Sequence, residues 1–155
     1  MKIIISPVDN QNIPVAMKLI EEVFDEFVAP DYSEQGIKTF KESFIYDRRF
    51  LAKFVEGNET MYGAYYKEEI VGCLSISINS TISCIFVKGE YHRKGIASML
   101  LNTVIEELKK RGVAAIRLNA SPYAIPFYHA QGFKNAGDTS DYNGIIYTPM
   151  ELDLI

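Results

Sequence analysis

The sequence contains few residues of the kinds that build metal centres and disulfide frameworks. Its 155 residues include no tryptophan, two cysteines and two histidines. Cys73 and Cys84 lie outside any Cys-x-x-Cys pair or Cys/His cluster, which argues against a metal site. Two small, isolated thiols are typical of buried side chains in a reducing compartment. We therefore expect no metal and a cytoplasmic protein.

Long apolar runs and an excess of basic residues are also absent. No apolar stretch approaches the roughly 18 residues that a membrane-spanning helix requires. The apolar start of the chain is too short for a signal peptide and is soon interrupted by charge. The formal net charge is −4, whereas nucleic-acid-binding domains are usually basic. Neither a membrane nor a nucleic acid is expected as a partner.

Two common phosphate-binding fingerprints, G-x-x-x-x-G-K-S/T and G-x-G-x-x-G, do not occur. A different arrangement is present. An apolar strand pattern from Ile82 to Val87 is followed by a basic turn at residues 92–95, and a helix is predicted from Ile96. The first N–H groups of a helix lack intrahelical partners, and its dipole favours negative charge there. Residues 92–98 are therefore predicted to hold a phosphorylated cofactor.

The basic turn resembles a motif of the GNAT superfamily, the Gcn5-related N-acetyltransferases. Its residues His92, Arg93, Lys94, Gly95, Ile96 and Ala97 match the pyrophosphate loop of that family, Arg/Gln-x-x-Gly-x-Gly/Ala. His92 stands where the family prefers Arg or Gln. This departure is mild, because such a turn binds mainly through backbone N–H groups.

A second segment, residues 119–133, resembles the other recurring motif of the family, N-x(n)-A-x-x-F/L-Y-x-x-x-G-F. Its matching positions are Asn119, Ala124, Phe127, Tyr128, Gly132 and Phe133. The segment also fits a plain helix that begins at Pro122 or Pro126 and ends at Gly132, with its aromatic residues in the core. Both interpretations can hold together. Two motifs in the right order and spacing identify the chain as a member of the GNAT superfamily.

The resemblance implies acetyl-CoA as acyl donor and assigns residues to it. The backbone of Phe86 and Val87 would bond the pantetheine arm, and the Val87 N–H would polarise the thioester carbonyl. Asn119 and Phe127 belong to the second motif, and Tyr128 would protonate or hydrogen-bond the departing thiolate. The pyrophosphate would be held by the turn and the first helical residues: His92, Arg93, Lys94, Gly95, Ile96, Ala97 and Ser98.

The general base stays open. Many family members carry a Glu on the fourth strand, but residues 81–87 contain no carboxylate. The amine could lose its proton through water or through the cluster of Asp25, Glu26, Asp31 and Tyr32. His129 is expected on a helix face.

Hydrophobic periodicity predicts the elements of the fold. Residues 79–80 are expected as a two-residue hairpin loop that pairs Leu74 with Ile85 and places Ile78 on their face, with Cys73 and Cys84 on the other. The order of elements predicts an α+β, or α/β layered, fold in one domain, residues 1–155. The fold is expected to contain a mixed, mostly antiparallel central sheet of about seven strands, together with about four helices. The resemblance implies that the central strands splay apart. Strands are expected at 2–6, 60–66, 70–78, 81–87, 113–119, 133–138 and 144–152, and helices at 12–28, 34–46 and 96–111 and between Pro122 and Gly132.

These features together predict an N-acetyltransferase that moves an acetyl group from acetyl-CoA to a primary amine. Seven Lys/Arg against three Glu in residues 88–117 suit an anionic cofactor, and the acidic flanks suit a cationic acceptor. The family's usual course is direct attack in a ternary complex. Two alternatives remain: an idle acyl-CoA-binding sensor or scaffold, and a transferase for a bulkier acyl group. The sequence does not identify the acceptor, which could be a small-molecule or a peptide amine. It also leaves the oligomeric state open, and a homodimer is one possibility.

Overall fold

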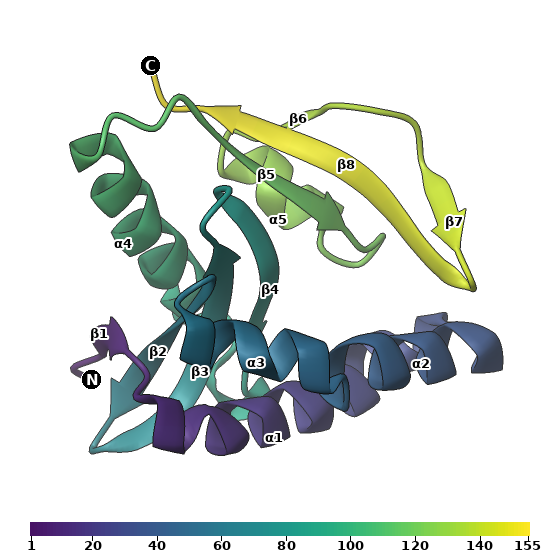
Figure 1. The fold of residues 1–155 in the computed structure, drawn as a ribbon, viewed down its shortest axis with the longest axis horizontal. Helices are drawn as coiled ribbons and strands as arrows, with labels where there is room; N and C mark the ends of the chain where they lie inside the picture. Colours follow the sequence, from purple (N-terminus) through teal and green to yellow (C-terminus); the bar gives the residue numbers. More distant parts are fainter.

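The computed structural model describes residues 1–155 as a single twisted sheet with helices on both faces (Figure 1). The strand order is β1-β2-β3-β4-β5-β8-β6, with β7 paired to β8. Only β4 and β5 run parallel; every other neighbouring pair is antiparallel. This confirms the predicted α+β fold with a mixed, mostly antiparallel sheet. The strands are β1 Ile4–Pro7, β2 Glu59–Tyr66, β3 Glu69–Ser77, β4 Thr81–Val87, β5 Ala115–Ala120, β6 Lys134–Asn135, β7 Ser140–Tyr142 and β8 Ile145–Asp153.

The helices cover the sheet in two groups, each over its own apolar core. The long α4 and the short α5 pack with Leu74, Ile116 and Met150 on one face. The N-terminal helices α1 and α3 pack with Met61 and Cys73 on the other. The α-helices are α1 Ile13–Val23, α2 Glu34–Phe40, α3 Arg48–Glu56, α4 Ile96–Lys110 and α5 Ile125–Ala130; α1 and α2 continue as π-helical turns, Phe24–Val28 and Lys41–Ile45.

Two elements were not predicted from the sequence. Helix α3 is strongly charged, and its apolar stripe is short, although Asp47 caps its start and Gly57, with φ +80°, ends it in the left-handed conformation. Strand β7 has three exposed residues and no apolar alternation. It forms only because β8 offers a partner edge. Both were missed because their local signals are weak.

The predicted hairpin between β3 and β4 is correct in register and wrong in its loop. Leu74 pairs with Ile85 as expected. The loop, however, has three residues rather than two, with Ser80 in the left-handed conformation at φ +60°. A β-bulge at Ser83 then restores the expected register, because Ser75 pairs with Cys84 and Ile76 with Ile82. Ile78 therefore lies in the loop, 67% exposed, and not on the core face.

The central strands β4 and β5 separate soon after they meet. They pair only at Thr81 with Arg117 and at Ile82 with Leu118. Beyond Ile82, this edge of β4 has no partner strand, and Figure 1 shows β4 turning away from β5 and β8. The predicted splay of the central strands is thus confirmed. None of the helices combines the length and apolar content that crossing a bilayer requires.

Candidate active site

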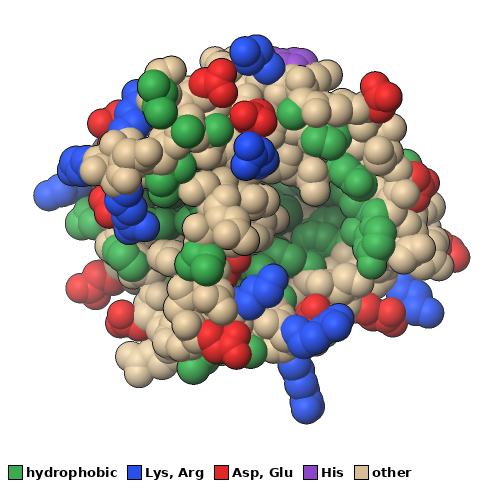
Figure 2. Space-filling model, turned by 45° about the horizontal axis from the view of Figure 1, so that its top comes forward, with side chains coloured by type: hydrophobic (Ala, Val, Ile, Leu, Met, Phe, Trp, Pro, Cys, Tyr) green, Lys and Arg blue, Asp and Glu red, His purple; other side chains and the backbone are tan.

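A cavity of about 1160 Å³ opens where β4 and β5 diverge. Figure 2 shows a hollow with hydrophobic side chains on its walls. The cavity has walls from both faces of the sheet, with Ile96 and Tyr128 on one side and Phe24 and Phe40 on the other. All predicted site residues line it except Lys94, which is exposed.

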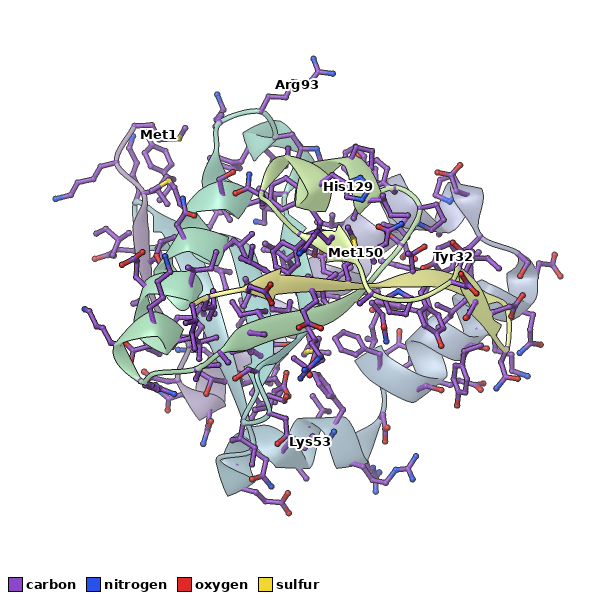
Figure 3. All side chains as sticks on the ribbon, turned by 90° about the horizontal axis from the view of Figure 1, so that it is seen from above. Met1, Tyr32, Lys53, Arg93, His129 and Met150 are labelled. Carbon is purple, nitrogen blue, oxygen red and sulfur yellow. The ribbon has the colours of Figure 1, made fainter.

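The start of α4 forms one end of the cavity. Gly95 precedes the helix with φ +77°, and no side chain caps the free N–H groups. The first intrahelical bond runs from Met99 N to Gly95 O at 3.0 Å, so the N–H groups of residues 96–98 have no helical acceptor. Arg93 also adopts the left-handed conformation, at φ +61°, and extends away from the body of the molecule (Figure 3). This end can bind an anion through backbone donors.

The side chain of His92 has a structural role that the sequence did not indicate. Its Nε2 lies 2.7 Å from the carbonyl oxygen of Val87, which can only accept, so Nε2 carries the proton. Its ring also packs against Phe27, with centroids 4.5 Å apart. His92 therefore fixes the turn to the end of β4.

The free edge of β4 presents alternate backbone groups to the cavity. Lys88 N donates to Val71 O at 2.9 Å, which makes Gly72–Val87 the non-hydrogen-bonded pair and Cys73–Phe86 the bonded one. The backbone of Phe86 thus faces β3, whereas the Val87 N–H points away from β3. A ligand in the cavity would therefore meet the backbone of Val87 rather than that of Phe86. The Phe86 side chain still lines the wall.

Tyr128 is held on α5 by packing around its ring. The residue is 5% exposed and lies between Phe127 and Phe133, with ring centroids 5.3 and 5.5 Å away. No protein group is hydrogen-bonded to its hydroxyl, and burial, with a smaller contribution from Cys84, raises the pKa of the phenol. The hydroxyl therefore stays protonated and free to donate into the cavity. From β5, Asn119 lines the same space.

Most of the alternative base residues lie away from the cavity. Asp25 forms an ion pair with Lys41 at 2.9 Å, and Glu26 is exposed. Asp31 lines a second cavity of about 430 Å³, which shares Tyr32 with the first. His129 is exposed on α5, 2.9 Å from Asn135 Oδ1 (Figure 3).

Sequence reasoning missed two features of the site. Ser83, the bulged residue of β4, lines the cavity and bonds the buried Glu59, although neither belongs to a motif. A group of aromatic side chains from the N-terminal helices also lines it: Phe24, Phe27, Tyr32, Phe40 and Phe44, which we name the aromatic wall. The helical spacing of the phenylalanines indicated a core, and they leave one side open to the cavity.

Residues 28–154 match the family model of the acetyltransferase (GNAT) domain. The chain belongs to this family. Its fold agrees, since the PaiA N-acetyltransferase from Thermoplasma acidophilum, solved in complex with coenzyme A, superposes with a TM-score of 0.82 at 21% identity over 99% of each chain. A GCN5-related N-acetyltransferase from Rhodopseudomonas palustris gives 0.83 at 17% identity, over 99% of this chain and 96% of that one.

A curated N-acetyltransferase is similar to this chain in sequence. The uncharacterised N-acetyltransferase YitH of Bacillus subtilis (strain 168) is 27% identical over 123 residues, which cover 77% of this chain. The match spans only 38% of the length of YitH. The family predicted from the two motifs is thus confirmed, while the substrates of this GNAT chain have to be argued from its own cavity.

Proposed function

We propose that this GNAT domain, running over residues 1–155, transfers an acetyl group from acetyl-CoA to a primary amine. One observation carries the proposal. The cavity has walls from both faces of the sheet, with the donor-rich start of α4 on one side and the aromatic wall on the other, and the two meet where Phe27 packs on His92. Two substrates can enter from opposite sides and meet beside Tyr128, which suits direct transfer in a ternary complex.

The start of α4 is suited to the pyrophosphate of coenzyme A. Three free backbone donors and the helix dipole would bind the phosphates, with Arg93 adding attraction from outside. The pantetheine arm would then follow the unpartnered edge of β4 past Val87. The structurally similar PaiA enzyme was solved in complex with coenzyme A, which supports coenzyme A as the ligand.

Transfer requires no covalent enzyme intermediate. The amine nitrogen attacks the thioester carbon, a C–N bond forms, and the C–S bond breaks as the carbonyl reforms; the nitrogen loses one proton, which balances the proton that the sulfur gains. The Val87 N–H, which points into the cavity, would stabilise the negative charge that develops on the oxygen. Tyr128 would donate its hydrogen to the departing sulfur, because its raised pKa keeps the hydroxyl protonated.

The proposal is tested by following thiol release from acetyl-CoA with a panel of primary amines, and by detecting the acetylated amine by mass spectrometry. Thiol release that depends on the amine supports the transferase. The lack of any carboxylate on the cavity wall favours the second candidate, an idle acyl-CoA-binding module. Binding of acetyl-CoA in calorimetry with no acetylated product from any amine would support that module instead.

A further inference from the structure

The wall of the cavity carries almost no charge. Of its 34 residues 25 are hydrophobic. The wall contains no Asp, Glu or Lys, and its only basic side chains are His92 and Arg93, at the start of α4. The aromatic wall extends from Phe27, which packs on His92, to Phe24 and Phe40, which stack at a centroid distance of 4.0 Å and an interplanar angle of 10°. Phe86 on β4 meets Phe40 edge-on at 6.2 Å. Such a surface gains binding energy from an apolar group, and it can hold an ammonium group only against the faces of its rings, because no carboxylate lies beside it to form an ion pair.

We propose that the acceptor is a compact amine with an apolar ring or chain, and that this group binds against the aromatic wall. The inference rests on the proposed function and names its substrate class. A polyamine or an aminoglycoside would have to bring further ammonium groups into this apolar space without partners. The carboxylates of Asp31 and Asp141 line the second cavity, which shares Val28, Tyr32, Tyr123 and Ile146 with the first, so spermidine tests whether they attract a second ammonium group.

The aromatic wall is closed on one side by a tight contact between α2 and the β7–β8 hairpin. A side chain at Gly36 would collide with the carbonyl of Gly144, so the two backbones approach as closely as glycines allow. The Thr39 hydroxyl donates to Asn143 O at 2.6 Å beside this contact. Tyr32 and Tyr142, which flank the contact, line the cavity. The closed end favours a small acceptor over a peptide.

The test compares kcat/KM for phenethylamine, ethylamine and spermidine at saturating acetyl-CoA. Phenethylamine should exceed both others by about tenfold or more, the discrimination that an apolar pocket provides. Phe40→Leu should lower kcat/KM for phenethylamine several-fold and leave that for ethylamine nearly unchanged. Phe54→Leu is the matched control, because Phe54 is buried, packs on Phe50 and neither lines the cavity nor stacks on the aromatic wall. It should leave the ratio between the two amines unchanged.

Three outcomes would overturn the inference. The first is that spermidine is the best acceptor, and the second is that Phe40→Leu leaves the ratio of kcat/KM for phenethylamine to that for ethylamine unchanged. The third is that a long-chain acyl-CoA reacts faster than acetyl-CoA with ethylamine, which would place the acyl chain against the aromatic wall. Failure of the proposed function is distinguishable. With no turnover of any amine, calorimetry on the coenzyme A complex would still detect phenethylamine binding that Phe40→Leu weakens if the apolar site is correct.

A second, independent observation concerns the buried carboxylate of Glu59. Glu59 begins β2 and is 4% exposed. Its side chain crosses β3 and accepts a hydrogen bond from the Ser83 hydroxyl of β4 at 2.7 Å. Ser83 is itself exposed and lines the cavity. A carboxylate is thus connected to the cavity by one hydroxyl group.

We infer that Glu59 is a positioning residue that orients Ser83 toward the acceptor amine. With its hydrogen committed to Glu59, the Ser83 oxygen can accept an N–H of the amine. As that proton moves to Ser83, the hydroxyl proton moves to Glu59. Burial raises the pKa of Glu59, and Ser83, Ser75 and Lys53 oppose the rise. The groups around Glu59 are therefore Lys53 from α3, Ser75 from β3, and Ser83 and Cys84 from β4.

The test is the pH dependence of kcat/KM in Glu59→Gln and Ser83→Ala. In each variant kcat/KM should fall about 10–100-fold, and the acidic limb of its pH profile should shift or disappear. The kcat/KM of the double variant should be no lower than that of the less active single variant. Glu56→Gln, an exposed carboxamide substitution on α3, is the control and should keep the wild-type profile. Wild-type rates and an unchanged acidic limb in Ser83→Ala would overturn the inference, even if Glu59→Gln fails to fold.

Discussion

Replacing Tyr128 by phenylalanine removes one hydroxyl group and leaves the ring in its packing between Phe127 and Phe133. If the hydroxyl donates to the departing sulfur, the variant loses a hydrogen bond to a charged group, which contributes about 1.5–3 kcal/mol. Since about 1.4 kcal/mol corresponds to a tenfold change in rate, kcat should fall about 10–100-fold. The Michaelis constant for acetyl-CoA should stay nearly unchanged, because the interaction forms only as the C–S bond breaks.

The assay measures kcat by thiol release and the melting temperature on the same preparation. The Tyr128 hydroxyl has no protein partner, so its removal leaves no buried group unsatisfied and the melting temperature should hold. Tyr62→Phe is the control, because Tyr62 is half-buried on β2 and does not line the cavity. Full turnover in Tyr128→Phe, or a fall in melting temperature with unchanged kcat per folded molecule, would refute the assignment.

Four further predictions follow from the same structure. Gly95→Val should weaken coenzyme A binding at least tenfold in calorimetry, because a branched residue is strained at φ +77° where the phosphate turn enters α4; unchanged affinity in a folded variant would contradict this. Cys73→Ser with Cys84→Ser should keep most of the activity, because direct transfer uses neither thiol, although the hydrogen bond with Cys73 lowers the pKa of the Cys84 thiol; a trapped acetyl-cysteine would refute direct transfer. Gly36→Ala should raise KM for the amine more than KM for acetyl-CoA, because α2 must move away from the β7–β8 hairpin; an equal effect on both would argue against a closed acceptor end. The change in unfolding free energy caused by Glu59→Gln should be more favourable at neutral pH than below pH 4.5, because the raised pKa means that the buried carboxylate destabilises the fold only when it is ionised; the same change in unfolding free energy at both pH values would contradict the raised pKa.

The phosphate turn and the short helix could be predicted from the sequence because their signals are local. Gly95 needs a left-handed backbone at the start of α4, and Tyr128 sits in a run that begins with a proline turn and ends at Gly132. Each feature depends on residues within a few positions along the chain. The placement of Tyr128 beside the diverging strands followed from the family resemblance rather than from these local rules.

The acceptor side of the cavity could not be predicted because it is assembled from distant segments. Glu59 reaches Ser83 across an intervening strand, and no spacing in the sequence reports that contact. The aromatic wall reads as the core stripe of two helices, and only the tertiary fold shows that one side of it faces a cavity. The approach of Gly36 to Gly144 likewise joins α2 to a hairpin near the other end of the chain.

Amine-dependent release of thiol from acetyl-CoA is the most direct test of the central claim that this chain transfers an acyl group to an amine. With phenethylamine present, we expect thiol release that saturates with the amine and matches the acetylated product mole for mole. Acetyl-CoA that binds in calorimetry, yet releases no thiol with phenethylamine or any other primary amine, would contradict the account.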